Sequence, residues 1–90
     1  MAKYTATCEY VQDGDSFRTA NQTWIRLARY DAPEKGKPGY DEAKRFLSNL
    51  ILNKGIVYEQ VGTSYDRIVA EVWQANANVN DMMINSGYKK

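Results

Sequence analysis

The chain has 90 residues, and its 12 basic and 11 acidic side chains leave a net charge of +1. This length predicts one domain, residues 1–90, with a modest core. A domain that binds nucleic acid more often has a clear basic excess. The near-balance of charge therefore excludes a general electrostatic attraction for phosphate, and any such attraction must be local.

One cysteine and no histidine narrow the chemistry further. A lone cysteine excludes an intramolecular disulfide, and the absence of histidine excludes a Cys/His catalytic pair. Zinc is not expected, because its usual nitrogen and sulfur ligands are missing. We expect Cys8 to be a small apolar residue of a strand.

The N-terminal segment lacks the long apolar stretch of a secretory leader, and no run approaches the length needed to span a membrane. As written, the chain is expected in the cytoplasm, or outside the cell if a leader was removed. We expect no membrane partner, and a monomer with at most weak self-association.

Three strands are predicted in the first third of the chain. Residues 4–11 alternate in a way that predicts a strand. One face of this strand should carry Tyr4, Ala6, Cys8 and Tyr10. Asp13-Gly14 is a turn signal, after which residues 16–19 should pair back as a second strand. Residues 23–29 then predict a third strand.

A loop, a helix and two further strands follow. Residues 31–39 hold both prolines and predict a loop. The next apolar residues have the spacing of one buried helical stripe: Ala43, Phe46, Leu47, Leu50 and Ile51. Strands are predicted at 56–61 and 68–73, and a short helix at 80–86 with Asn80 as its N-cap. This order predicts a mainly β protein with helices, an OB-fold five-stranded Greek-key barrel.

Five charged residues fall in three short clusters at strand ends or in loops. Asp15 follows the first turn, Arg26, Asp31 and Glu34 lie on or after the third strand, and Arg67 precedes the fifth. Converging carboxylates repel one another unless a cation lies between them, and ligands that are all oxygen suit Ca²⁺. Arginine forks match a phosphate group. Together these residue types indicate metal-assisted cleavage of a phosphodiester.

The order of these segments resembles the staphylococcal nuclease (thermonuclease) family along nearly the whole chain. The segments that carry the resemblance are Val11-Gln12-Asp13-Gly14-Asp15, Arg26-Leu27, Asp31-Ala32-Pro33-Glu34, Glu42-Ala43, Tyr65-Asp66-Arg67-Ile68-Val69-Ala70 and Asn78-Val79-Asn80. One such segment alone is a weak signal, because an Asp-Gly-Asp turn is common in β proteins. Several such segments in the same order are a specific signal, and the resemblance implies a staphylococcal-nuclease-like barrel.

The resemblance implies a Ca²⁺-dependent nuclease acting on single-stranded or frayed DNA and RNA. It assigns Ca²⁺ binding to Asp15, Asp31 and the backbone carbonyl of Ala32. It assigns activation of the attacking water to Glu34. Asp13 is a candidate acceptor for a water bound to the metal.

The resemblance also implies roles for the two arginines and a tyrosine. Arg26 and Arg67 would bind and stabilise the phosphate, with Arg67 nearer the departing 5′-oxygen, so that cleavage leaves a 3′-phosphate. Tyr65 is a candidate nucleotide contact, although packing is an alternative for it.

One departure from the family pattern leaves alternatives open. Where relatives usually carry glycine before the arginine, this chain has Asp66, whose charge could compete with phosphate for Arg67. Aspartate tolerates the left-handed backbone angles that such a position requires. The alternatives are a catalytically weak or inactive nucleic-acid-binding or scaffold module and a plain OB-fold binder of single strands. Clustered acids argue against the last of these.

Overall fold

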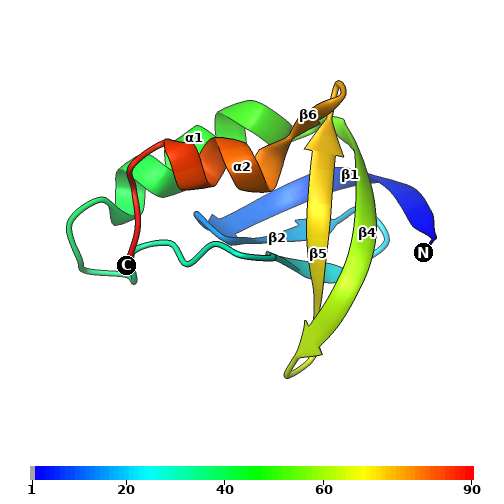
Figure 1. Cartoon of the computed structure of the whole chain (residues 1–90), viewed down its shortest axis with the longest axis horizontal. Helices are drawn as coiled ribbons and strands as arrows, with labels where there is room; N and C mark the ends of the chain where they lie inside the picture. Colours follow the sequence, from blue (N-terminus) through cyan, green and yellow to red (C-terminus); the bar gives the residue numbers. More distant parts are fainter. Residues whose placement is uncertain (1) are drawn as a thin grey trace.

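The chain runs through three strands, a helix, three more strands and a second helix in the computed structural model, which describes residues 2–90 (Figure 1). The elements are β1 Lys3–Asp13, β2 Ser16–Thr19, β3 Trp24–Leu27, α1 Tyr40–Ile51, β4 Gly55–Ser64, β5 Arg67–Gln74, β6 Ala77–Asn78 and α2 Val79–Asn85. This confirms the predicted OB-like order, with a helix between the third and fourth strands. The two-residue strand β6 was not predicted.

The strands close into a barrel because β3 pairs with two partners. The order across the sheet is β3-β2-β1-β4-β5-β6, and β3 also pairs in parallel with β5. In that pairing Ile25 lies opposite Ile68, and Leu27 lies opposite Ala70. Closure leaves no exposed edge between β3 and β5. It also places the strand that carries Arg26 directly beside the strand that begins at Arg67.

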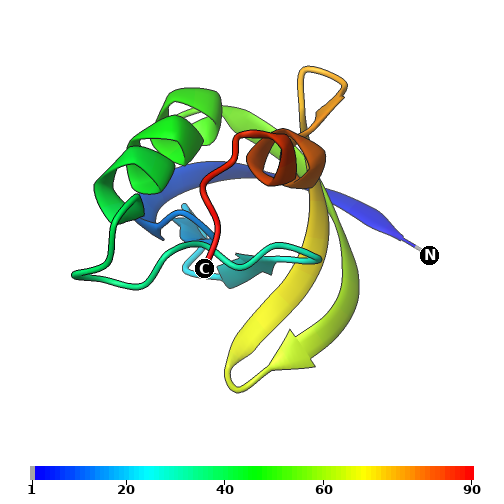
Figure 2. The same cartoon turned by 60° about the vertical axis from the view of Figure 1, so that its left-hand side comes forward.

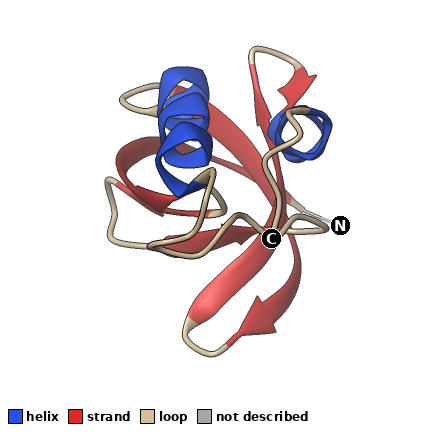
Figure 3. Cartoon of the chain, turned by 90° about the vertical axis from the view of Figure 1, so that its left-hand side faces the viewer, coloured by secondary structure: helices blue, strands red, loops and turns tan. Residues whose placement is uncertain are grey.

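The two helices lie together over one end of the barrel, and the β4–β5 turn projects from the other end (Figures 1 and 3). The predicted apolar stripe is confirmed, because Ala43, Leu47 and Ile51 of α1 are fully buried. Fully burying a leucine or isoleucine side chain contributes about 1.5–3 kcal/mol. Among residues 2–90, neither helix is long and apolar enough to cross a membrane.

The predicted alternation of β1 is wrong at its second half. Cys8 is fully buried, as expected, but Tyr10 is 45% exposed and Val11 is buried instead. The register of β1 against β2 shifts between Cys8 and Tyr10, so a β-bulge adds one residue to β1 there. Since side chains alternate along a strand, one added residue turns Tyr10 to the outside of the barrel.

The N-cap predicted for the last helix is also wrong. The cap of α2 is Asn78, whose Oδ1 accepts a hydrogen bond from the Asp81 N–H at 2.8 Å. Asn80 is instead fully buried, and its Oδ1 accepts from the Val72 N–H at 2.8 Å. Its Nδ2 donates to the Ala28 carbonyl at 2.9 Å. Asn80 therefore ties α2 to β5 and to the start of the loop that follows β3.

Candidate active site

The Asp13-Gly14-Asp15 turn joins β1 to β2 and packs tightly against its surroundings. A Cβ at position 14 would lie 2.7 Å from the Cβ of Ala43 and 2.9 Å from the Cβ of Ala32, both closer than real Cβ contacts allow. Glycine is therefore required here by the close approach of α1 and the loop that begins at Asp31. This packing brings Asp15 next to that loop.

Asp15, Arg26 and Asp31 form one ion-pair cluster. The Asp15 side chain is only 13% exposed, and its Oδ2 lies 3.4 Å from Arg26 Nη2. Arg26 Nη2 also donates to Asp31 Oδ1. The Ala32 N–H donates to Asp15 Oδ2 at 3.1 Å. The structure thus brings the two predicted carboxylate ligands, and the main chain at position 32, around one guanidinium group.

The acidic neighbours of Arg26 in this cluster favour its positively charged form. Partial burial works against the charged form, but the hydrogen bond with Asp31 and the charges of Asp15 and Asp31 outweigh it and raise the pKa of Arg26 above its usual value. Arg26 is on the outer side of β3, between the buried Ile25 and Leu27, as the alternation predicts.

Asp13 adds a third acid to the same corner. Its Oδ1 accepts from the Asp15 N–H at 3.2 Å. Burial, together with the hydrogen bond and the charge of neighbouring Asp15, raises the pKa of Asp13 to about 6, while the charge of Arg67 opposes the rise. The local excess of carboxylate oxygen, without nitrogen or sulfur ligands, fits a hard divalent cation such as Ca²⁺. Within residues 2–90, no three His, Cys, Asp or Glu side chains form a ready-made metal cage, so main-chain oxygen or water has to complete any coordination.

Arg67 is connected to the acidic corner through a serine that the sequence reasoning missed. Its Nη1 donates to Ser16 Oγ at 2.9 Å, and that hydroxyl donates to Asp15 Oδ1 at 3.1 Å. Ser16 is fully buried. The one available signal is its position directly after the turn, at the start of β2, where its side chain must lie on the same side as Arg26 of the paired strand.

A cleft of about 460 Å³ opens beside the cluster. It is lined by Gln12, Trp24, Arg26, Ser64, Tyr65, Asp66 and Arg67. The three predicted substrate-binding residues, Arg26, Tyr65 and Arg67, therefore share one surface. Gln12 and Trp24 were not predicted. The buried Gln12 Oε1 has no hydrogen-bond partner within residues 2–90.

Comparison with known proteins identifies the family of the chain. A family profile described as "Staphylococcal nuclease homologue" matches residues 24–90, which is most of the chain. The chain belongs to the family of staphylococcal nuclease homologues. An "Uncharacterized endonuclease" from Haemophilus influenzae is 32% identical over 88 residues, covering 90% of this chain and 49% of that protein. The chain spans about half the length of this curated relative.

In this staphylococcal nuclease homologue, Asp66 does not take the left-handed conformation expected for it. The positive φ of the β4–β5 turn is at Tyr65, with a value of 55°, and the side chain of Tyr65 is fully exposed. Among the ion pairs of residues 2–90, none joins Asp66 to Arg67. The expected competition for Arg67 thus has no ion pair to support it.

The predicted general base, Glu34, makes no ion pair with Arg26 of the cluster among residues 2–90. Glu34 is on the loop after β3 with its side chain 60% exposed, and its Oε1 lies 2.8 Å from Lys90 Nζ. The hydrogen bond and charge of Lys90 lower the pKa of Glu34. The Lys90 N–H also donates to the Asp31 carbonyl at 3.1 Å, so the C-terminal segment runs beside this loop (Figure 2).

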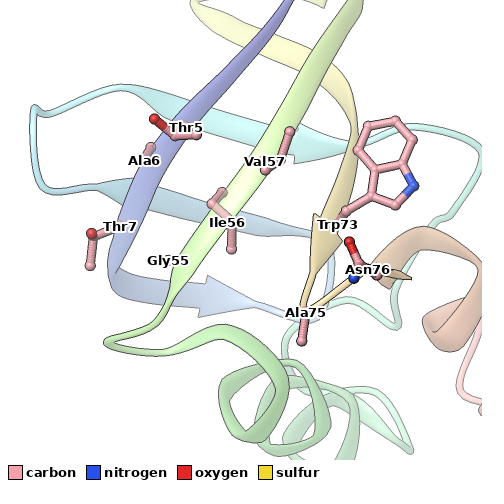
Figure 4. A pocket seen from close by; sticks show the side chains of 9 residues that line it. All are labelled: Thr5, Ala6, Thr7, Gly55, Ile56, Val57, Trp73, Ala75 and Asn76. Carbon is pink, nitrogen blue, oxygen red and sulfur yellow. The ribbon is translucent and has the colours of Figure 1, made fainter.

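A second hollow, of about 430 Å³, lies at the other end of β5. Figure 4 shows its lining residues: Thr5, Ala6, Thr7, Gly55, Ile56, Val57, Trp73, Ala75 and Asn76. None of them is charged. The cleft, in contrast, is lined by the charged residues Arg26, Asp66 and Arg67.

Proposed function

We propose that this chain is a Ca²⁺-dependent nuclease that hydrolyses phosphodiester bonds of DNA and RNA, cleaving the 5′-O–P bond and leaving 3′-phosphates. The observation that carries the proposal is the shared cleft of Arg26 and Arg67, which adjoins the carboxylates of Asp15 and Asp31. Two arginine forks suit the oxygens of one phosphate, and adjacent carboxylates suit the divalent ion that such chemistry uses.

The charges explain why a metal would be needed. Asp13, Asp15, Asp31 and Glu34 carry four negative charges when all are ionised. Arg26, Arg67 and the Lys90 that pairs with Glu34 carry three positive ones, so the site formed by these groups alone is slightly negative. That site would repel a phosphodiester. A divalent cation makes the total positive, and one phosphodiester then makes it neutral. Ca²⁺ is therefore expected to promote substrate binding as well as reaction.

Asp15, Asp31 and the Ala32 carbonyl are the groups proposed to hold Ca²⁺, which when bound supplies a Lewis acid for a phosphate oxygen. The Ser16 hydroxyl keeps Asp15 and Arg67 in a fixed relation.

The remaining steps use side chains of this chain. Glu34 accepts a proton from a water molecule, and the water oxygen forms a bond to phosphorus while the bond from phosphorus to the 5′-oxygen breaks. The 5′-oxygen leaves with the bonding electron pair and takes up a proton from solvent water to give the 5′-hydroxyl product. Arg26 and Arg67 donate hydrogen bonds to the phosphate oxygens as negative charge develops. The pairing with Lys90 keeps Glu34 ionised, and Glu34 has to exchange this partner for water in order to act as a base.

The decisive experiment incubates the purified chain with single-stranded DNA in Ca²⁺ or in chelator, together with a Glu34→Gln variant. Cleavage should require Ca²⁺, fall steeply in the variant and give 3′-phosphate ends. Cleavage that is indifferent to both the metal and the substitution would refute the proposal.

One observation favours a second candidate, a catalytically weak or inactive nucleic-acid-binding module. Glu34 pairs with Lys90 and makes no hydrogen bond or ion pair to Arg26 or Arg67 within residues 2–90. Binding of DNA without cleavage under any metal condition would select this alternative. The cleft of Arg26, Tyr65 and Arg67 would then serve to bind the strand only.

A further inference from the structure

Three side chains form a row on the outer surface of β1, β2 and β3. Tyr10 lies opposite Arg18, and Arg18 lies opposite Trp24, so one residue of each strand contributes. The Arg18 guanidinium carbon lies 5.5 Å from the centre of the Tyr10 ring and 5.6 Å from that of Trp24. The two rings are 6.1 Å apart and nearly perpendicular. The bulge in β1 is what turns Tyr10 outward to join this row.

The row continues directly from the cleft. Trp24 lines the cleft together with Arg26 and Arg67, and it is also the inner member of the row. Starting from Arg67, a strand leaving the cleft along β3 and β2 would pass Arg26, Trp24 and then Arg18. The acidic group found within this row is Glu9, whose Oε2 accepts from Arg18 Nε at 3.2 Å.

We propose that Tyr10, Arg18 and Trp24 form a second binding site for the same nucleic-acid strand, which begins at Trp24 of the cleft lining and continues beyond the cleft over Arg18 and Tyr10. A base stacks on the exposed aromatic surface, and Arg18 attracts the adjoining phosphate. The ligand is single-stranded, because the bases of a duplex are already stacked on one another and cannot reach these rings. This inference rests on the proposed function, since it assumes that a phosphodiester occupies the cleft.

The alternative is a purely structural role, in which the row stabilises the sheet and binds no ligand. Cross-strand aromatic and cation–π contacts of this kind contribute to many sheets without any ligand. Two features go beyond that account: the Tyr10 side chain is 45% exposed, and the row is continuous with a cleft lined by two more arginines.

The chain provides its own control. It has two tryptophans, and the other, Trp73, lies on β5 six residues after Arg67, about 20 Å along the strand. Trp73 also has a cation near its ring, since Lys3 Nζ is 4.6 Å from its centre. It stands out from β5 beside the uncharged hollow (Figure 4). Trp73 thus resembles Trp24 in being an indole ring with a nearby cation, but it does not line the cleft.

The experiment titrates single-tryptophan variants with a ten-nucleotide oligothymidylate in Ca²⁺, on a Glu34→Gln background so that the strand stays intact. Trp73→Phe keeps Trp24, whose fluorescence should be quenched to saturation. Trp24→Phe keeps Trp73, whose fluorescence should not change. Adding Tyr10→Leu to the first variant should weaken binding roughly 5- to 160-fold, the range for loss of one stacked base. A duplex of the same length should not quench Trp24.

Absence of quenching in the variant that keeps Trp24 would overturn the proposal, and so would an unchanged affinity after Tyr10→Leu. Equal quenching of Trp73 or equal quenching by duplex would overturn it as well. Because Trp24 also lines the cleft, its quenching alone does not show that the row is occupied, and the affinity of the Tyr10→Leu variant decides this. Arg18→Met, which should also weaken binding, takes its place if the Tyr10→Leu protein does not fold. Cleavage by the unsubstituted chain is scored separately. Cleavage without quenching would remove only the second site, and quenching without cleavage would remove only the nuclease proposal.

Discussion

Replacing Ser16 by alanine removes the hydroxyl group that joins Arg67 to Asp15. The side chain is fully buried, and its Oγ lies 2.9 Å from Arg67 Nη1 and 3.1 Å from Asp15 Oδ1. A hydrogen bond to a charged group contributes about 1.5–3 kcal/mol. If the bond to Arg67 mainly aims the guanidinium at the phosphate, its loss should lower kcat by about 10- to 100-fold, at 1.36 kcal/mol per tenfold.

The decrease in kcat caused by Ser16→Ala should not exceed that caused by Arg67→Met, which removes the oriented donor itself and should cost about 10²–10³ in rate. Ser16 acts through Arg67, so the two effects should not add: in the Arg67→Met background, Ser16→Ala should change kcat little. Ser48→Ala is the matched control, since Ser48 Oγ donates only to the Lys44 carbonyl of α1, at 2.8 Å. It should leave kcat unchanged.

The assay is single-turnover cleavage of single-stranded DNA in saturating Ca²⁺ for all four variants, with unfolding by urea measured in parallel. Losses from Ser16→Ala and Arg67→Met that multiply in the double variant would contradict a positioning role for Ser16. An unchanged kcat in Ser16→Ala would contradict it as well.

Three further predictions concern packing, pH and the Glu34 ion pair. Gly14→Ala should destabilise the fold by about 1–3 kcal/mol through overpacking against α1, and an unchanged urea midpoint would show that the turn can shift freely. Burial raises the pKa of Cys8 from 9.0 to about 11. Between these pH values the folded chain retains a thiol proton that the unfolded chain loses, so the free energy of unfolding should fall as the pH rises from 9 to 11. Urea unfolding at both pH values should show an extra loss of up to about 3 kcal/mol that Cys8→Ala lacks, and equal losses would refute this cause. Lys90→Met should free Glu34 and raise the cleavage rate, whereas a lower rate would mean that Lys90 assists the reaction.

The elements that could be predicted from the sequence are those whose signal is local. The spacing of Ala43, Leu47 and Ile51 determines which face of α1 is buried, whatever it packs against. The alternation of Ile25 and Leu27 around Arg26 likewise predicts which way each side chain of β3 points. Such patterns depend on backbone geometry alone, and the structure agrees with them.

The features that were missed depend on contacts between distant segments. Asn78 and Asn80 are equally good caps by type. What distinguishes them is that β5 and the loop after β3 supply hydrogen-bond partners for Asn80. Tyr10 turns outward because of a β-bulge that the residue types of β1 do not predict. In the site, the motifs identify the charged residue types, but they cannot indicate that Ser16 links Arg67 to Asp15.

The pairing of β3 with β5 is what makes a two-arginine cleft available in so short a chain. Arg26 and Arg67 are separated by 40 residues in sequence, and only the parallel ladder that closes the barrel places their strands side by side. That same ladder is secured by Asn80, whose amide donates to the Ala28 carbonyl after β3 and to the Ala70 carbonyl of β5, at 2.9 and 3.0 Å. A buried amide outside the cleft thus helps to fix the distance between the two guanidinium groups that are proposed to hold one phosphate.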